Sequence, residues 1–267
     1  MIIDCFMIFN ELGILEGRLE YLYGKVDYFV IVEANITHSG NPKPLHFMQN
    51  MSRYKRYLDK VLYFPFSYDT SKLDLSVKLD KFDYDSPHWE IEKQQRSHIL
   101  EALNFFDNND IVIISDVDEI PSHSSIDVMN NIIGKEASSA ALEQQMFYYN
   151  FKQCQFYPWH GSTVSTVSFA KEHGVQWLRD MRYMMPVIHT GGWHLSYWGS
   201  AEHIANKINN FAHQEFNKEE YKDISSIKNK IAAGQDVFDR QGLLRPIDRS
   251  LIDPAILSIF EKYSNKG

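Results

Sequence analysis

Four apolar runs that alternate with amphipathic segments constrain the first 115 residues of this chain more than any other feature. Each run is almost continuously apolar, as expected of a strand that is buried on both faces. The expected strands cover residues 2–9, 26–32, 60–66 and 111–115. Helical spacing predicts helices over 11–23 and 89–106, with a short one near 51–58. This alternation predicts parallel strands joined by right-handed crossovers, with ligands bound at the carboxyl ends of the strands.

The remainder of the chain is less regular and richer in aromatic residues and histidine. Short strands are expected near 140–149 and 163–170, and helices near 200–211 and 218–233. No repeat, low-complexity tract or linker divides the sequence. We therefore expect a single α/β domain over 1–267, with a Rossmann-like, mostly parallel sheet flanked by helices and an irregular C-terminal half.

The composition of the chain indicates which kinds of binding partner and which cellular compartment to expect. A formal net charge of −8 disfavours nucleic acid, whose phosphates require a basic surface. No apolar run reaches the ~18 residues of a membrane span, which leaves only peripheral membrane contact. The opening residues lack a basic region and are interpreted as a strand, not a signal peptide. Two cysteines, Cys5 and Cys154, are too few for a disulfide framework and favour a reducing, cytoplasmic location.

The most informative motif follows the fourth expected strand, which ends in three carboxylates at Asp116, Asp118 and Glu119. Asp116 and Asp118 are two residues apart, so their side chains point the same way in extended backbone. A cation would relieve the repulsion between them, and hard oxygen ligands suit Mg²⁺ or Mn²⁺. A second D-x-D, at Asp83 and Asp85, has no strand before it and is interpreted as a solvated loop.

Two other interpretations of this acidic motif are a polar strand-to-loop turn and the site of a metal-dependent phosphohydrolase. Phosphatases of the haloacid dehalogenase type carry their D-x-D after the first strand, usually with threonine two residues on. Here the motif follows the fourth strand and position 120 is Ile. The sheet edge at which ligands bind therefore favours a metal and nucleotide site.

The sequence Asp116-Val-Asp-Glu-Ile-Pro121 resembles the corresponding motif of glycosyltransferase family 17. Three further blocks agree in order, so that the resemblance extends from about residue 3 to residue 239. The residues that carry these blocks are Asn10, Glu11, Leu15, Arg18 and Leu22; 30–35 with Gly40, Pro42, Pro44, Leu45 and Phe47; and Gly192, Trp193, His194, Ser196, Lys207 and 211–216.

The resemblance implies a GT-A fold and inverting transfer of N-acetylglucosamine from UDP-N-acetylglucosamine, with Mn²⁺ or Mg²⁺ as cofactor. Residues 1–121 then form the nucleotide-sugar half and 122–267 the acceptor half. We expect no membrane anchor or stem like those of animal family members, and the segment between the D-x-D and Trp193 is shorter than theirs. We therefore expect a surface-polysaccharide or lipid-linked saccharide as acceptor instead of an N-glycan core. The alternative from another class is a sugar-binding protein without turnover.

Five residues are expected to bind the donor: Asn10, Glu33, Arg96, Asp116 and Asp118. Glu33 ends the second strand at the edge that carries Asp116, where it would bind the uracil or ribose, or else cap a loop. Arg96 shares a buried helical stripe with Ile99 and Leu103, and a guanidinium there requires an anion. That anion is either the donor diphosphate or an acidic side chain. Asn10 is carried over from the resemblance.

His194 follows two glycines that allow close backbone approach, and imidazole is a good ligand for Mn²⁺-like ions. We expect His194 to complete the metal site of Asp116 and Asp118, against the alternative of a core histidine. Its neighbour Trp193 is expected to stack on the acceptor sugar.

An inverting transfer also needs a carboxylate that is free of the metal to take the acceptor proton. The candidates are Glu143, Glu215, Asp236 and Asp239. Glu215 is preferred because it follows a helix that begins close to His194 and matches an acidic residue of the family block. Asp239 is the second choice.

Overall fold

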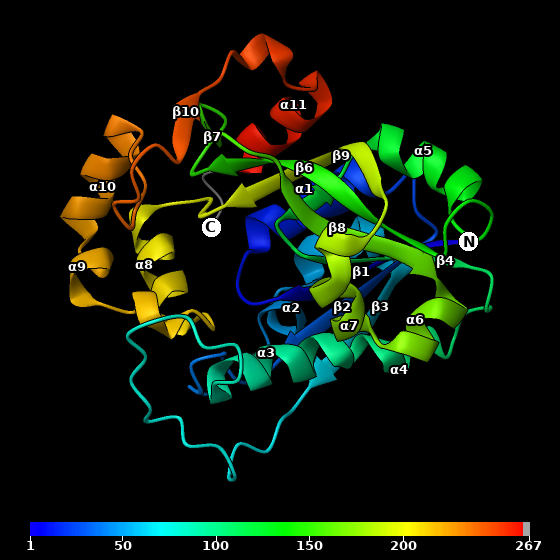
Figure 1. Ribbon diagram of the computed structural model, residues 1–267, viewed down its shortest axis with the longest axis horizontal. Coiled ribbons are helices and arrows are strands. Elements are labelled where there is room, and N and C mark those ends of the chain that lie inside the picture. Colours follow the sequence, from blue (N-terminus) through cyan, green and yellow to red (C-terminus); the bar gives the residue numbers. More distant parts are fainter. Residues whose placement is uncertain (264–267) are drawn as a thin grey trace.

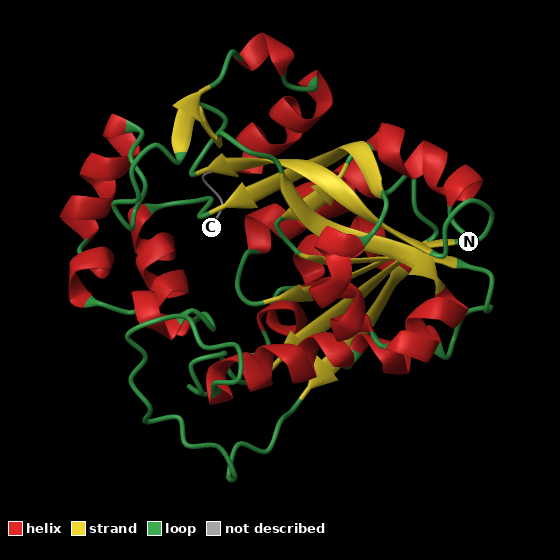
Figure 2. Cartoon of the chain, viewed as in Figure 1, coloured by secondary structure: helices red, strands yellow, loops and turns green. Residues whose placement is uncertain are grey.

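A ten-stranded mixed sheet runs through both halves of the chain in the computed structural model, which describes residues 1–263 (Figure 1). The strand order is β10-β7-β6-β8-β4-β1-β2-β3, with β9 beside β6 and β5 beside β9. Helices cover both faces of this sheet (Figure 2). None of the helices within the described residues is long and apolar enough to cross a bilayer.

The first half of the fold is the parallel part of the sheet. β1, β2, β3 and β4 are parallel neighbours, as the alternating pattern predicts. Side chains of β1 alternate between the two faces, so that Phe6 and Ile8 enter one apolar core and Ile3 and Cys5 the other. The bounds are β1 Ile2–Ile8, α1 Leu12–Leu22, β2 Tyr28–Ala34, α2 His46–Gln49, η1 Met51–Lys60, β3 Val61–Phe66, α3 Pro87–Ser97, α4 Ile99–Leu103 and β4 Ile111–Asp116.

The second half extends the sheet mainly with antiparallel strands, so the sheet as a whole is mixed. β8 is antiparallel to β4, and β6 is antiparallel to β8 but parallel to β9. The bounds are β5 Glu119–Pro121, α5 His123–Ile132, β6 Ser139–Tyr148, β7 Gln153–Gln155, β8 Trp159–Thr166, α6 Val167–His173, α7 Val175–Met181, η2 Arg182–Met184, β9 Val187–Ser196, α8 Ala201–Asn210, η3 Gln214–Phe216, α9 Glu219–Lys222, α10 Ile224–Ala233, β10 Leu244–Pro246, η4 Arg249–Leu251 and α11 Pro254–Tyr263. The α/β class with flanking helices is confirmed.

Several expected elements differ in detail from the structure. The helix expected near 218–233 is divided into α9 and α10, and the short helix expected near 51–58 is the 3₁₀ helix η1. The strand expected near 163–170 stops at Thr166, whose side chain accepts a hydrogen bond from the Phe169 N–H and caps α6. The helix expected over 89–106 begins at Pro87 and is divided into α3 and α4. Its buried stripe is nevertheless as expected, with Arg96 and Ile99 turned inward.

A short antiparallel ladder joins the acidic motif to the distant Trp-His block. β5 pairs with β9 so that Glu119 lies opposite His194 and Pro121 opposite Gly192. Gly192 has a φ of 131°, and a Cβ there would lie 2.0 Å from the Ile120 carbonyl oxygen, so only glycine fits. Backbone pairing thus brings residues about 75 positions apart in sequence to one place.

Candidate functional site

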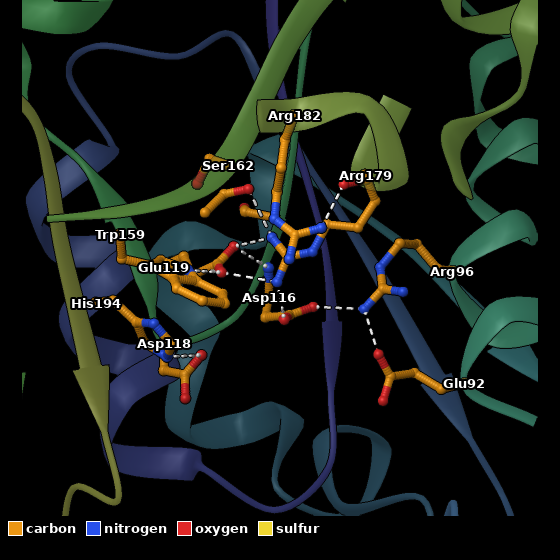
Figure 3. Close-up of polar contacts among 12 residues, drawn as sticks. Glu92, Arg96, Asp116, Asp118, Glu119, Trp159, Ser162, Arg179, Arg182 and His194 are labelled. Carbon is orange, nitrogen blue, oxygen red and sulfur yellow. Dashed lines mark hydrogen bonds and ion pairs between the residues drawn. The ribbon is translucent and has the colours of Figure 1, made fainter. Parts of the chain in front are cut away.

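A cavity of about 840 Å³ lies at the carboxyl ends of β1 and β4, where ligands bind in parallel sheets. Its wall carries carboxylates, guanidinium groups and lysines together with many aromatic rings. Asp116, Asp118, Arg96 and His194 all line it, so four of the expected site residues meet here. Figure 3 shows the polar contacts at its centre.

Asp116 is held between two arginines. Arg96 Nη2 lies 3.1 Å from Asp116 Oδ1, and Arg179 Nη2 lies 2.7 Å from Oδ2 (Figure 3). Burial opposes ionisation, but the charges of Arg179 and Arg96 outweigh it and hold the pKa of Asp116 well below its ordinary value. Of the two anions expected for Arg96, the structure thus supplies the acidic side chain.

Glu119 is fully buried behind Asp116 and serves as the counter-ion of Arg179. Both of its oxygens accept from Arg179 at 2.8 Å, and Trp159 Nε1 donates to Oε1 at 2.9 Å. The Asp116 N–H donates to the other oxygen at 3.1 Å. This third carboxylate therefore fixes the turn of the acidic motif and is not among the residues that line the cavity.

Asp118 contacts a lysine and a histidine. Lys207 Nζ of α8 lies 2.8 Å from Asp118 Oδ2, and His194 Nε2 lies 3.5 Å from Oδ1. Burial raises the pKa of Asp118, but Lys207 and then His194 outweigh it, so the carboxyl stays ionised well below its ordinary pKa. Nδ1 of His194 is buried and has no hydrogen-bond partner among the described residues.

The fit of a divalent cation rests on Asp118 and His194. Their facing atoms are 3.5 Å apart, close enough to share one ion, and a carboxylate with an imidazole suits Mn²⁺. Asp116 instead directs both oxygens at arginines. Within residues 1–263, no three His, Cys, Asp or Glu side chains gather closely enough to hold a metal by themselves. An ion here would need further ligands from its substrate.

A fully buried arginine donates hydrogen bonds to the backbone of the acidic motif. Arg18 of α1 donates through Nη1 to the carbonyl oxygens of Asp116, Val117 and Glu119 at 3.0, 3.1 and 2.7 Å. Its Nε and Nη2 donate to Asp4 of β1 at 2.8 and 2.5 Å. The turn that aims Asp116 and Asp118 into the cavity is therefore tied to the first strand and the first helix.

Two expected donor residues lie outside the cavity wall. Glu33 is fully buried; its oxygens accept from Lys43 Nζ, the Phe47 N–H and the Tyr63 hydroxyl at 3.2, 3.0 and 2.9 Å. It anchors the loop after β2, and this geometry does not support contact with a donor. Asn10 lies between the lining residues Phe9 and Glu11, with its Oδ1 buried and unpartnered among the described residues.

Trp193 is on the opposite side of β9 from His194, because successive residues of a strand face opposite ways. It packs edge-on against Tyr21 with 5.8 Å between ring centroids and borders a separate hollow of about 360 Å³. This placement does not support the expected stacking on an acceptor in the main cavity. Trp159 and Trp89 line that cavity instead.

The carboxylates expected to act as catalytic base are also not among the residues that line the cavity. Asp239 is exposed and pairs with Lys230 at 2.8 Å, and Asp236 is enclosed by Arg240. Glu143 contacts the exposed His189 at 3.2 Å. Glu215 is buried behind His213, which does line the cavity.

Sequence reasoning missed Arg179, although a signal for it exists. Val175, Leu178 and Arg179 stand at helical spacing, and all three are buried on one face of α7. An arginine on such a stripe indicates a buried anion, as it did for Arg96. Lys207 was noted only as part of a sequence block, yet it faces the same way as the buried Ile204 and Ile208.

Acid should weaken the ion pairs of Asp116. Since its folded pKa is depressed, these pairs stabilise the fold above the unfolded pKa of roughly 3.9 and lose that effect as the pH falls below it. The free energy of unfolding, measured with urea, should therefore fall more steeply below about pH 4 in the wild type than in Asp116→Asn. Equal slopes would show that the pairs contribute nothing.

Comparison with solved structures finds only weak likenesses. The inositol-1-phosphate CTP transferase from T. maritima gives a TM-score of 0.38 at 8% identity, over 72% of this chain and 88% of that one. The galactosyltransferase LgtC in complex with donor and acceptor sugar analogues gives 0.35 at 8% identity, over 81% and 83%. These scores are too low to bear on function.

Sequence comparison is more informative. Two β-1,4-mannosyl-glycoprotein 4-β-N-acetylglucosaminyltransferases, from Rattus norvegicus and Homo sapiens, are each 24% identical over 272 residues. The match covers 87% of this chain but 47% and 48% of those proteins, so the chain spans about half the length of these curated relatives. The family model of glycosyltransferase family 17 matches residues 1–242. With nearly the whole sequence matched, this chain belongs to glycosyltransferase family 17.

Proposed function

We propose that the protein is an inverting, metal-dependent glycosyltransferase with a GT-A-type fold. It transfers N-acetylglucosamine from UDP-N-acetylglucosamine to a hydroxyl of a glycan or lipid-linked saccharide. The observation that carries this proposal is the meeting of Asp116, Asp118 and His194 in one cavity at the carboxyl end of β4. The two relatives are named for N-acetylglucosaminyl transfer, which supports the choice of donor sugar.

Asp118 and His194 would hold Mn²⁺ or Mg²⁺, with the donor diphosphate as a further ligand. A bound ion supplies positive charge that offsets the charge developing on the departing nucleotide. Lys207 pairs with Asp118 at 2.8 Å, and once an ion binds that carboxylate the lysine would be released to pair with a donor phosphate. Asp116, fixed by Arg96 and Arg179, retains lone pairs that can accept from the ribose hydroxyls.

Arg182 is a second candidate for the diphosphate. It lines the cavity, and its guanidinium, which lies over the rings of Trp159 and Tyr183, forms no ion pair with a carboxylate of the described residues. Nη1 donates to the Arg179 carbonyl at 2.6 Å, whereas Nε is buried and has no hydrogen-bond partner within residues 1–263. Burial and the neighbouring Arg179 lower its pKa, and a phosphate would relieve both effects.

In this scheme residues 1–121 supply most of the donor site, and 122–267 supply His194, Arg179 and Lys207 together with the acceptor side. We propose that the protein works in the cytoplasm, because Cys5 and Cys154 are both free thiols. The two alternatives are a sugar-binding protein without turnover and a metal-dependent phosphohydrolase.

The decisive experiment measures UDP release from a panel of nucleotide sugars with a saccharide acceptor, with Mn²⁺ or with excess EDTA. We expect release from UDP-N-acetylglucosamine that depends on acceptor and metal. Full activity in EDTA would contradict the metal dependence. Tight binding without release would favour the sugar-binding protein, and hydrolysis of a phosphate monoester without sugar transfer would favour the phosphohydrolase.

His194→Ala should weaken the affinity for Mn²⁺ and UDP by at least about tenfold, because it removes one of two protein ligands. Calorimetric titration of the metal–nucleotide pair measures this, and thermal unfolding of the same variant should change little. His189→Ala is the matched control, since His189 is exposed and outside the cavity. Unchanged affinity in His194→Ala would assign His194 to the core instead.

A further inference from the structure

A histidine–carboxylate pair borders the cavity just beyond α8. Glu215 is 7% exposed, and its Oε1 lies 2.7 Å from Nδ1 of His213. Its other oxygen is buried and has no hydrogen-bond partner among the described residues. An ionised carboxylate in this position requires the ring hydrogen on Nδ1, which leaves the lone pair of Nε2 free.

The pair is oriented so that His213 could act as a base in the cavity while Glu215 holds its imidazole in place. His213 lines the cavity and its side chain is 40% exposed, whereas Glu215 stands behind it. The other two histidines of the cavity wall are already engaged. Both ring nitrogens of His38 have partners, Gln95 at 2.9 Å and Glu92 at 3.4 Å, and His194 faces Asp118.

His213 also lies on the same wall as the donor residues. Lys207 of α8 contacts Asp118, and Asn210 and Ala212, which follow it, line the same cavity up to His213. Lys207 on α8 contacts the acidic motif, and the chain that leaves the end of this helix at Asn210 carries His213 on the wall of the same cavity. The base and the site of the departing nucleotide thus share one space.

Aromatic rings surround the imidazole and suit a saccharide. The Phe82 and Trp89 rings lie 5.7 and 4.9 Å from His213 between centroids, and both residues line the cavity. Figure 1 shows why they meet: the loop between β3 and α3, which carries Phe82, passes beside the C-terminal end of α8. Flat apolar faces beside a polar group are what a sugar ring with its hydroxyls needs.

From this geometry we infer that His213 accepts the proton of the acceptor hydroxyl and that Glu215 is its positioning residue. The inference rests on the proposed glycosyl transfer. The acceptor oxygen bonds to C1 of the donor sugar while its proton passes to Nε2 of His213. The bond between C1 and the β-phosphate oxygen breaks, and UDP leaves with the electron pair. The role expected for Glu215 itself thereby passes to the imidazole that it orients.

The test compares His213→Ala, Glu215→Gln and the control His189→Ala in the full chain. We expect His213→Ala to lose about a hundred- to ten-thousand-fold in kcat while the affinity for Mn²⁺ and UDP is unchanged. Glu215→Gln should lose at least about tenfold in kcat with little change in KM, because its amide no longer favours the correct tautomer. Added imidazole should restore part of the kcat of His213→Ala only.

Three outcomes would overturn the inference. One is a His213→Ala variant that keeps more than about a tenth of the wild-type kcat. Another is a folded His213→Ala variant whose lost activity imidazole does not restore, since that would indicate a structural role. A third is a larger loss in Glu215→Gln than in His213→Ala, which would make the carboxylate the base. A wild-type protein that transfers no sugar would instead defeat the proposed function, and this inference with it.

Discussion

Asp118→Asn is expected to abolish transfer and also to destabilise the fold. The amide is a poor metal ligand, so kcat/KM should fall by at least about a hundredfold. The same change leaves Lys207 without its main partner. Breaking a buried pair costs roughly 3–5 kcal/mol. The cost here should be smaller, because the Lys207 side chain is 22% exposed and Glu11 lies 4.0 Å from it.

The double variant Asp118→Asn with Lys207→Met separates the two effects. Methionine fills a similar volume without charge, so most of the lost stability should return, as measured by urea unfolding, whereas the transfer rate should not. Lys207→Met alone reports whether the lysine is needed for the donor. If the double variant regained activity together with stability, Asp118 would be a structural partner of Lys207 and not a metal ligand.

Arg18→Met should have the largest effect on stability. The Arg18–Asp4 pair is fully buried, and its loss leaves the Asp4 charge unpaired, at a cost of about 3–5 kcal/mol. Three carbonyl oxygens of the acidic motif would lose their donor at the same time. The midpoint of urea unfolding should therefore shift strongly, and donor affinity should fall in the fraction that remains folded.

A second variant tests whether Arg18 positions the acidic motif or only neutralises Asp4. Combining Arg18→Met with Asp4→Leu removes the unpaired charge, and much of the stability should recover. Donor affinity should remain weak, since the carbonyls of Asp116 and Val117 lose the guanidinium that donates to them. Recovery of full affinity in the double variant would reduce Arg18 to a counter-ion.

The first half of the fold could be predicted from sequence because its pattern is local. Each buried strand is an apolar run, and each helix shows its stripe, so even Arg96 could be placed on an inward face. The second half depends on pairings between distant segments, such as β5 with β9 and β8 with β4. Such pairings leave only a weak trace in the residues themselves.

The site was predictable in position but not in its partners. The carboxyl end of β4 fixes where Asp116 and Asp118 lie, whatever surrounds them. Which cation each carboxylate meets depends on α7 and α8, which fold back from far along the chain. Glu33 was expected at the site because it ends a strand at the sheet edge that carries Asp116, and Trp193 because it precedes His194 in sequence. Glu33 instead accepts hydrogen bonds from the loop after β2, and the Trp193 side chain lies on the side of β9 away from the cavity.

The ladder between β5 and β9 limits where this chain can gain or lose residues. One extra residue in either strand would exchange the two sides of β9 relative to the acidic motif, so that Trp193 would face Asp118 and His194 would point toward Tyr21. Changes of length between the two motifs must therefore occur in the connections between residues 122 and 186. An insertion or a grafted loop that preserves the β5–β9 register keeps His194 beside Asp118. One that shifts the register by a single residue separates the two side chains.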